Sequence, residues 1–451
     1  MRIRSRLTAT ARIALVLLTA TGCVVDGRPV RDGLPTATEL GLPQQSLFAM
    51  PMRRQPVRGW RIGAATLGLD SKANIRYSPI RNIGDRAIFL AMTSADWSVI
   101  GIDVSNGHKL FEPVRLGRHE SAEGMLASAC FANGPKMVVC LRGGTEPGAR
   151  THAWVIDTDT GGLRYDGPTD LNWAMPKADP AVKQLGDYLV ATADDQGVYG
   201  VGPRAELTWH VPGTGSGSFP KDDDSDVPAP ALAVQSRLRE PDVVFSLADG
   251  KVLTPPVPAG EKVRRAVVYA DGFAYELDRD YTGTGIAFFD DEGREQGRLD
   301  GDAQLRSGSE VIPIAQTETA DRVLTIAGKP LLELPKFNLM PYTRLAGTTL
   351  LVSTDEDQRI WRQFDLRTGT EGKTCDNEAI SYAYIGSSGD VVVTSGGRNT
   401  KALAQGMDLM TCETLWTLPG PTIDEAKDIW RVNTTLVLRV NNELSSLVPP
   451  D

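Results

Sequence analysis

The 451-residue sequence has few aromatic residues, few histidines and no excess of positive charge. Phe, Trp and Tyr together make up 6% of the chain, and only 4 residues are His. Lys and Arg number 48 against 57 Asp and Glu, which gives a net charge of −9. This balance excludes a broadly cationic nucleic-acid binder, and we expect no nucleic-acid partner.

The common catalytic and metal-binding motifs are also missing. The chain contains no GxSxG, HExxH or CxxC pattern, and its histidines are scattered. The glycine-rich stretch at 282–285 does not follow a strand and open a helix, as a dinucleotide or phosphate loop would. We therefore assign no catalytic, cofactor-binding or metal-binding residues, expect no cofactor, and favour a protein that is not an enzyme.

The first thirty residues predict export from a bacterial cell. Four arginines precede a short apolar run at 13–19, which is too short to span a bilayer. Small residues then lead to Cys23, a pattern typical of the lipobox at which diacylglycerol is attached. We expect 1–22 to be a lipoprotein signal peptide and Cys23 to be lipidated (palmitate included), with plain secretion as the alternative. No later stretch approaches the ~20 apolar residues of a membrane span.

The mature chain is therefore expected to lie on the extracytoplasmic face of the cell membrane, held by its lipid. Residues 23–56 are rich in Pro, Gly and polar residues, and we predict that they form a lipid-anchored, flexible, mostly extended tether. Residues 57–451 would form the folded body.

The four remaining cysteines suit an oxidising compartment, where an even number predicts disulfides. Cys130 and Cys140 flank a predicted turn, so they would face each other across a hairpin. Cys375 and Cys412 lie at matching ends of two successive repeats. We favour these two pairings, with free buried thiols as the alternative.

The body repeats one pattern every ~40–50 residues, the period of a radial array of small sheets. An apolar strand ends in Asp, a turn containing Gly follows, and the next strand closes on an aromatic residue or Leu. The 45 glycines and 29 prolines suit many short strands joined by turns. Each four-stranded antiparallel unit has two apolar faces, and stacking units around an axis buries both.

We predict an all-β fold, a single β-propeller closed by its N- and C-terminal strands. The stretch at 57–62 is expected to supply a lone outer strand, and 434–448 two further strands of the same blade. The count of candidate units slightly exceeds eight, so we expect eight blades, or seven. The rival fold is two smaller β-domains divided at the polar segment 213–229.

Segments such as IDVSNGHKLFE (102–112), VYGVGPRAELTW (198–209) and MDLMTCETLWTLPG (407–420) resemble the repeats of quinoprotein-type, PQQ-like β-propellers. The turn of the last segment departs from the family pattern because Cys412 replaces the usual Gly. Quinoprotein dehydrogenases of this family hold PQQ and calcium on the propeller axis, and that residue set cannot be placed in this chain. The same repeat builds non-catalytic envelope lipoproteins, among them the bacterial outer-membrane assembly lipoprotein.

The resemblance implies a non-catalytic scaffold that binds an envelope protein or polymer through its loops. A quinoprotein-like oxidoreductase and a sensor of small ligands on the axis are the alternatives.

Three groups of side chains are candidate sites. The acidic run Asp222–Asp226 lacks the alternate spacing of a calcium loop, and a solvated loop is favoured. Asp157–Gly161 and Asp355–Asp357 are expected to be turns between strands. The repeated tryptophans are expected to pack between blades rather than to line a ligand channel; they are Trp97, Trp154, Trp209, Trp361 and Trp416.

Overall fold

A computed structural model describes most of the chain, which divides into two compact units, Met1–Leu34 and Pro35–Asp451. The first unit, with Cys23, lies almost wholly outside the described residues. No helix among the described residues is long and apolar enough to cross a membrane. The described residues are 34–94, 96–118, 128–143, 150–173, 180–215, 226–237, 240–306, 311–337, 342–353, 355–396, 401–422 and 425–451.

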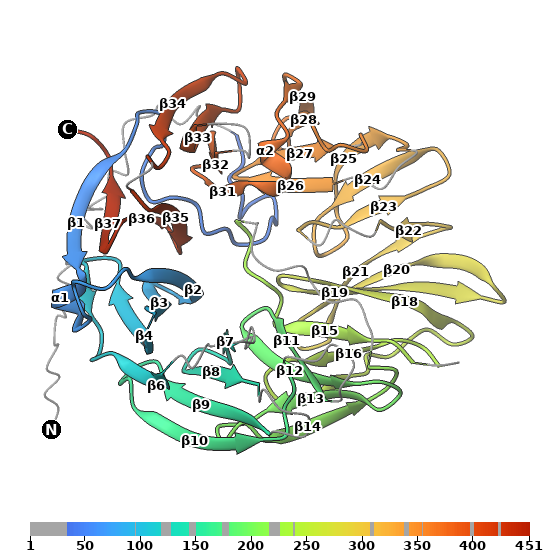
Figure 1. The fold of residues 1–451 in the computed structure, drawn as a ribbon. Coiled ribbons are helices and arrows are strands. Elements are labelled where there is room, and N and C mark those ends of the chain that lie inside the picture. Colours follow the sequence, from blue (N-terminus) through green and yellow to red (C-terminus); the bar gives the residue numbers. More distant parts are fainter. Residues whose placement is uncertain are drawn as a thin grey trace, which may run out of the picture. The chain divides into compact units, whose positions relative to one another are not determined.

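The second unit consists of nine small antiparallel sheets that follow one another around a common centre (Figure 1). We number these blades 1 to 9, with the closing blade last. In each blade the first strand along the chain lies at one edge of the sheet and the last at the other, apart from the closing blade.

Blade 1 contains β2 (Arg76–Ile83), β3 (Arg86–Met92), β4 (Asp96–Asp103), β5 (His108–Lys109) and β6 (Val114–Arg118). Blade 2 contains β7 (Ser128–Ala132), β8 (Met137–Arg142), β9 (Thr151–Asp157) and β10 (Leu163–Thr169). Blade 3 contains β11 (Ala181–Leu185), β12 (Tyr188–Ala193), β13 (Gly197–Val201) and β14 (Leu207–Pro212). Blade 4, with three strands among its described residues, contains β15 (Leu232–Gln235), β16 (Val243–Ser246) and β17 (Val252–Leu253).

Blade 5 contains β18 (Lys262–Tyr269), β19 (Gly272–Arg279), β20 (Thr282–Asp290) and β21 (Glu295–Asp300). Blade 6 contains β22 (Gln304–Leu305), β23 (Ile314–Gln316), β24 (Ala320–Leu324) and β25 (Pro330–Pro335). Blade 7 contains β26 (Tyr342–Ala346), β27 (Thr349–Ser353), β28 (Ile360–Asp365), β29 (Thr370–Glu371) and β30 (Cys375–Asp376). Blade 8 contains β31 (Tyr384–Ser387), β32 (Val391–Ser395), β33 (Ala402–Asp408) and β34 (Thr414–Pro419).

Blade 9 contains β35 (Lys427–Val432), β36 (Thr435–Val440), β37 (Glu443–Val448) and, as its outer strand, β1 (Val57–Gly63). Among the described residues, two one-turn helices, α1 (Ala64–Leu67) and α2 (Ala379–Tyr382), lie in the connections. In blades 1 and 7 the fourth strand is divided, because both β5 and β6 pair with β4, and both β29 and β30 pair with β28.

The described residues form nine separate hydrophobic cores that hold the blades together, one at each interface between neighbouring sheets. Between blades 9 and 1, for example, Val437 and Leu444 pack with Phe89 and Ile100, all at most 1% exposed. Between blades 4 and 5, Val244 packs with Phe273 and other residues of the next sheet. Each blade thus buries both faces against its neighbours, which is the physical reason for the radial arrangement.

The two ends of this unit close the ring in one sheet. β1 runs antiparallel to β37, with Val57 opposite Val448 and Gly63 opposite Glu443. The predicted closure by N- and C-terminal strands is therefore confirmed, and the two-domain alternative is wrong. The predicted number of blades is also wrong: there are nine, because the eight internal repeats are all genuine and the closing blade adds one.

The repeated Asp–Gly turn has one geometry in four blades. Each Asp ends a third strand, and its carboxylate accepts a backbone N–H two residues later at 2.8–2.9 Å. The fourth residue after the Asp donates its N–H to the Asp carbonyl at 2.8 Å. The pairs of turn residues are Asp103 with Gly107, Asp157 with Gly161, Asp365 with Gly369 and Asp408 with Cys412.

One of these glycines shows how the turn also joins neighbouring blades. Gly107 has φ of +77°, and a Cβ there would lie 2.6 Å from the Trp60 ring of β1. Trp60 also donates its indole N–H to the carbonyl of Val104 at 2.7 Å. The bare glycine therefore lets the aromatic ring of one blade lie flat on the turn of the next.

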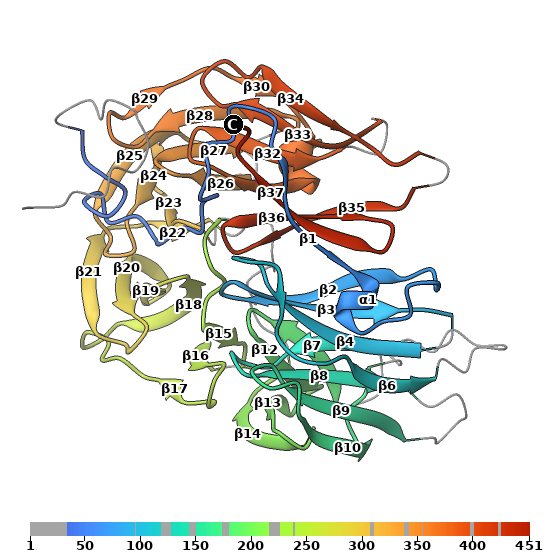
Figure 2. The same cartoon turned by 90° about the vertical axis from the view of Figure 1, so that its left-hand side faces the viewer.

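The predicted tether is wrong for the part that the structure describes. Residues 35–56, which we call the strap, pack on blades 5 to 9, and Leu42, Phe48 and Met52 are buried (Figure 2, blue). Their apolar side chains fill gaps between blade cores, which outweighs the entropy lost on ordering a segment rich in Pro and polar residues. The folded body thus begins at about residue 35 and not at 57.

Candidate functional site

The strap lies on the face that carries the turns between first and second strands, which we call the turn face. The side chain of Gln45 accepts from and donates to the backbone of Gly347, in the β26–β27 turn, at 2.8 Å in both cases. Phe48 donates its N–H to Ser387 at 2.8 Å, and Ala49 donates to Thr434 at 3.1 Å. The strap therefore joins blades 7, 8 and 9 by hydrogen bonds to their backbone.

The end of the strap replaces a turn that the closing blade lacks. Because β1 and β37 are far apart along the chain, no turn connects the third and fourth strands of blade 9. Trp416 of blade 8 donates its indole N–H to the carbonyl of Met52 at 2.6 Å, as Trp60 does to Val104 in the next interface. Arg53 adds an ion pair with Asp408 at 2.6 Å.

Asp226 is buried rather than solvated, which corrects the prediction for the last residue of the acidic run. Its carboxylate accepts hydrogen bonds at 2.6 Å from the hydroxyls of Tyr384 and Ser387 and pairs with Arg431. Its carbonyl accepts the N–H of Ser46 in the strap at 2.7 Å. Burial raises the pKa of the Tyr384 hydroxyl, so this hydroxyl remains a donor. Residues 222–225 lie outside the described part of the chain.

This network fixes a connection that crosses the ring. Residues 226–231 lead from blades 8 and 9 to the first strand of blade 4, and Figure 1 shows this segment passing through the middle of the ring. Val227 joins the core between blades 6 and 7. The polar side chains around Asp226 are therefore bonded to one another.

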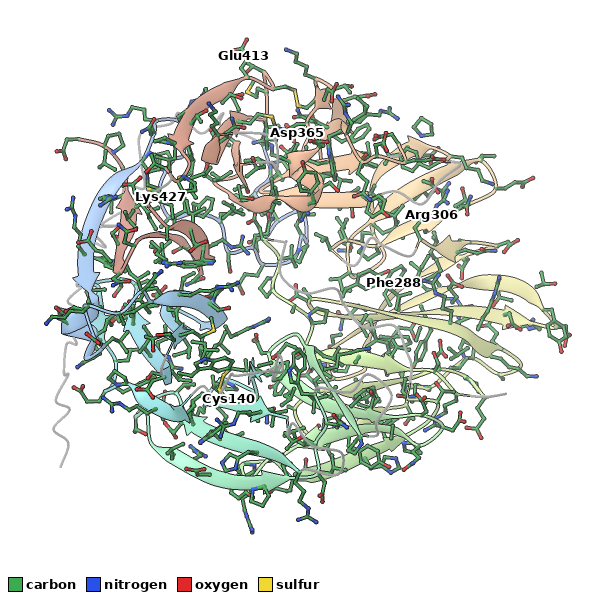
Figure 3. All side chains as sticks on the ribbon, in the orientation of Figure 1. Cys140, Phe288, Arg306, Asp365, Glu413 and Lys427 are labelled. Carbon is green, nitrogen blue, oxygen red and sulfur yellow. A yellow bond between two sulfur atoms is a disulfide. The ribbon has the colours of Figure 1, made fainter. Side chains whose placement is uncertain are left out.

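Both predicted disulfides are present. Cys130 and Cys140 are direct partners on β7 and β8, with Cα atoms 4.0 Å apart, and Figure 3 marks Cys140 beside this bond. Cys375 of blade 7 and Cys412 of blade 8 are bonded with Cα atoms 5.5 Å apart. The first bond lies within one hairpin, whereas the second joins neighbouring blades.

The tryptophans pack between blades, as expected, with one partial exception. Trp154, Trp361 and Trp416 are at most 6% exposed, and each belongs to a core between two sheets. Trp97 is partly buried in the core between blades 1 and 2. Trp209 is partly buried between blades 3 and 4 and also lines a pocket.

The other acidic clusters are turns. Asp157 accepts the N–H groups of Asp159 and Thr160, and Asp355 accepts those of Arg359 and Ile360 between β27 and β28. Three further carboxylates, Asp290, Asp291 and Glu292, lie within 4.8 Å of one another after β20. Asp290 accepts the backbone N–H groups of Glu292 and Arg294 there, which accounts for the cluster as a turn.

The candidate binding site is a pocket of about 440 Å³ on the turn face of blades 2 to 4. Its walls come from four turns: 133–137, the turn before Tyr188, 200–203 and 247–248. The strap covers turns of blades 5 to 9 and does not reach this pocket. The volume falls in the range of ligand-binding clefts.

Hydrogen bonds hold three of these turns together. The Asn133 side chain donates to the Val201 carbonyl at 2.7 Å and accepts the N–H of Leu189 at 3.3 Å. Gly134 donates its N–H to Asp187 at 2.6 Å. The pocket is therefore built on a rigid junction between blades 2 and 3.

Two unpaired polar groups of the pocket, on Trp209 and Lys136, are donors, while the Tyr188 and Thr208 hydroxyls can donate and accept. Trp60 donates its indole N–H to the next blade and Trp416 donates its own to the strap, but the equivalent Trp209 has no such acceptor among the described residues. Lys136 is exposed and forms no ion pair within the described part of the chain, while Arg164 pairs with Asp157. Burial, helped by nearby carboxylates, raises the pKa of Tyr188 and keeps its hydroxyl protonated.

Sequence reasoning misses this pocket. It identifies Trp209 only as a packing residue, and it gives Lys136 no role within the hairpin of Cys130 and Cys140. The one signal in the sequence is the turn Asn133–Lys136, which ends in a cation at the tip of a hairpin.

Comparisons with known sequences give one family and one relative. Residues 33–450 match the family described as a conjugation-associated 9-bladed beta-propeller domain. An uncharacterized protein of Mycolicibacterium smegmatis (strain MKD8) is 37% identical over 473 residues, covering 98% of this chain and 95% of the relative.

Two solved structures show weaker likeness. The computationally designed Ika8 protein has a TM-score of 0.36 and 15% identity, covering 76% of this chain and 100% of its own. KlHsv2 with loop 6CD replaced by a Gly-Ser linker has a TM-score of 0.28 and 11% identity, covering 56% of this chain and 85% of its own. Neither bears on the assignment.

The nine blades of the structure agree in number with the family description, and the matched span includes the strap. The resemblance of the repeat to PQQ-like propellers remains a prediction. This chain belongs to the family of conjugation-associated nine-bladed β-propellers.

Proposed function

We propose that this chain is a non-catalytic, lipid-anchored scaffold of the bacterial cell envelope that binds a protein partner during conjugation. The observation that carries the proposal is the family match over residues 33–450, since the family is described by its association with conjugation. The pocket on the part of the turn face that the strap leaves open supports a binding role.

The two disulfides support a location outside the cytoplasm, because such bonds persist in oxidising compartments. Anchoring through Cys23 would then hold the propeller near the membrane. The strap, which packs on the blades, is the first part of the folded body along the chain. The oxidoreductase and sensor alternatives gain no support from the polar groups around Asp226, which bond to one another.

Membrane fractionation of cells that produce the Cys23→Ser variant tests the anchor. The variant is expected to move from the membrane fraction to the soluble extracytoplasmic fraction, because a chain without the lipid on residue 23 has no stable attachment to the membrane. Thr19→Ser, a conservative change in the same leader, serves as the control and should stay with the membrane. Unchanged retention of Cys23→Ser would contradict the lipoprotein assignment.

The scaffold role is tested by in-cell crosslinking and affinity purification from the native host during mating. A stoichiometric envelope protein in the eluate, together with reduced transfer frequency when the chain is deleted, is the expected result. Normal transfer without the chain would refute the role in conjugation. A bound metal or quinone in the eluate would favour the oxidoreductase alternative.

A further inference from the structure

We infer that the pocket of blades 2 to 4 binds an extended, proline-containing acidic segment of a partner protein. This inference rests on the proposed scaffold role and specifies the chemistry of the partner that the scaffold binds. The walls of the pocket, its hydrogen-bonding groups and its charge each point to such a segment.

The walls suit a chain segment rather than a compact ligand. Trp209 and Tyr188 line the same pocket as the prolines of two turns, Pro135 and Pro203. Aromatic and proline surfaces of this kind bind the flat apolar faces of polyproline II segments, which lose little entropy on binding because they are already extended. The bonds of Asn133 keep these walls in place before the segment arrives.

The hydrogen-bonding groups point to a ligand rich in acceptors. The Trp209 indole N–H has no acceptor among the described residues, and the Lys136 ammonium only donates. The amide of Asn133 is already used at both ends. A proline in the ligand presents its carbonyl to these donors and has no N–H that needs an acceptor.

The positive charge of the pocket lining indicates that the ligand contains an acidic residue. The charged side chains that line the pocket are Lys136 and Arg164, both cationic, although the whole chain has a net charge of −9. Arg164 already pairs with Asp157, so Lys136 is the cation left for the partner. A carboxylate within reach of Lys136 would complete its pairing.

The test measures fluorescence anisotropy of labelled decapeptides with the full chain purified in detergent. The probe is five Pro-Glu repeats, and the comparison peptides are five Pro-Lys and five Gly-Glu repeats. Only the Pro-Glu peptide is expected to bind with saturation. Lys136→Glu should weaken this binding by about fivefold or more, the size of an exposed charge pair. Trp209→Phe, which keeps the packed ring, should weaken it by about two- to tenfold.

Lys329→Glu is the matched control, since Lys329 is an exposed lysine of the β24–β25 turn in blade 6. Its affinity for the Pro-Glu peptide should equal that of the wild type. Absence of binding, equal binding to Lys136→Glu, or equal binding of the Gly-Glu peptide would each overturn the inference. Crosslinking in cells tests the scaffold role separately, so a partner found there without peptide binding would refute this pocket alone.

Discussion

At the scale of the residue, the Asp of each turn is the most informative position in the repeat. Backbone and side-chain hydrogen bonds to the carboxylate lower the pKa of Asp103 and Asp365. For Asp157 the partner Arg164 is the largest cause, with the N–H groups of Thr160 and Asp159 adding to it, and its pKa falls to about 2. The charged carboxylate therefore stabilises the turn.

The Asp157 turn predicts a specific dependence on pH. A pKa lowered to about 2 in the folded chain means that this stabilisation is present above about pH 4, the ordinary value of Asp. It is lost as the pH falls from about 4 to 2. Asp157→Asn should therefore lower the free energy of unfolding at pH 7 by up to about 1 kcal/mol, because Arg164 is exposed and screened. At pH 3 the difference from the wild type should be smaller.

Urea unfolding at the two pH values measures this difference. Asp280→Asn, an exposed position in the β19–β20 turn, is the control and should match the wild type at both. If Asp157→Asn lowers the free energy of unfolding as much at pH 3 as at pH 7, the charge of the carboxylate has no part in the effect.

Cys412 shows what sequence can reveal at this scale. The repeat has Gly at this turn position, and the departure to Cys, with Cys375 one repeat earlier, predicts the bond that the structure contains. Cys412 takes φ of +60°, a conformation that costs a non-glycine residue roughly 1 kcal/mol or more. A residue that breaks a local rule in this way indicates a compensating contact elsewhere.

At the scale of the element, the strap is where composition gives the wrong answer. Pro, Gly and polar residues in 23–56 indicate an extended chain, yet in the described part of this range Leu42, Phe48 and Met52 are buried. Their spacing follows no period of helix or strand, because each fits a gap between blades. The pocket could not be predicted for a similar reason, since its four turns come from three blades.

The packed strap predicts that Met52→Ala destabilises the fold. Met52 is 0% exposed in the core between blades 8 and 9, and such truncations cost about 2–5 kcal/mol. Met410→Ala is the matched control, because Met410 is 80% exposed in the β33–β34 turn and should leave stability unchanged. Chemical denaturation followed by tryptophan fluorescence measures both. Equal stability of the two variants would mean that residues 35–56 are a free tether after all.

At the scale of the whole chain, the number of blades follows from how the ring closes. The sequence pattern identifies eight internal repeats by their strand pairs and turns, and it also predicts a closing blade from strands of both ends. The prediction of eight blades, or seven, is wrong because it discards one of these candidates, whereas the structure contains all nine. In such a ring the closing blade is counted in addition to the internal repeats.

Closure also determines stability, since β1 and β37 bring the two ends of this unit into one sheet. Truncation after Trp430 removes β36 and β37, whose buried residues include Leu436, Val437 and Leu444, each 0% exposed. At about 1.5–3 kcal/mol for each buried side chain, the loss is comparable to the 5–15 kcal/mol that holds a typical domain together. The truncated chain should lose its cooperative thermal transition in calorimetry. The control chain, truncated after Val448, keeps every strand and should melt as the full chain does. If the chain ending at Trp430 also melts like the full chain, the ring does not depend on its closing blade.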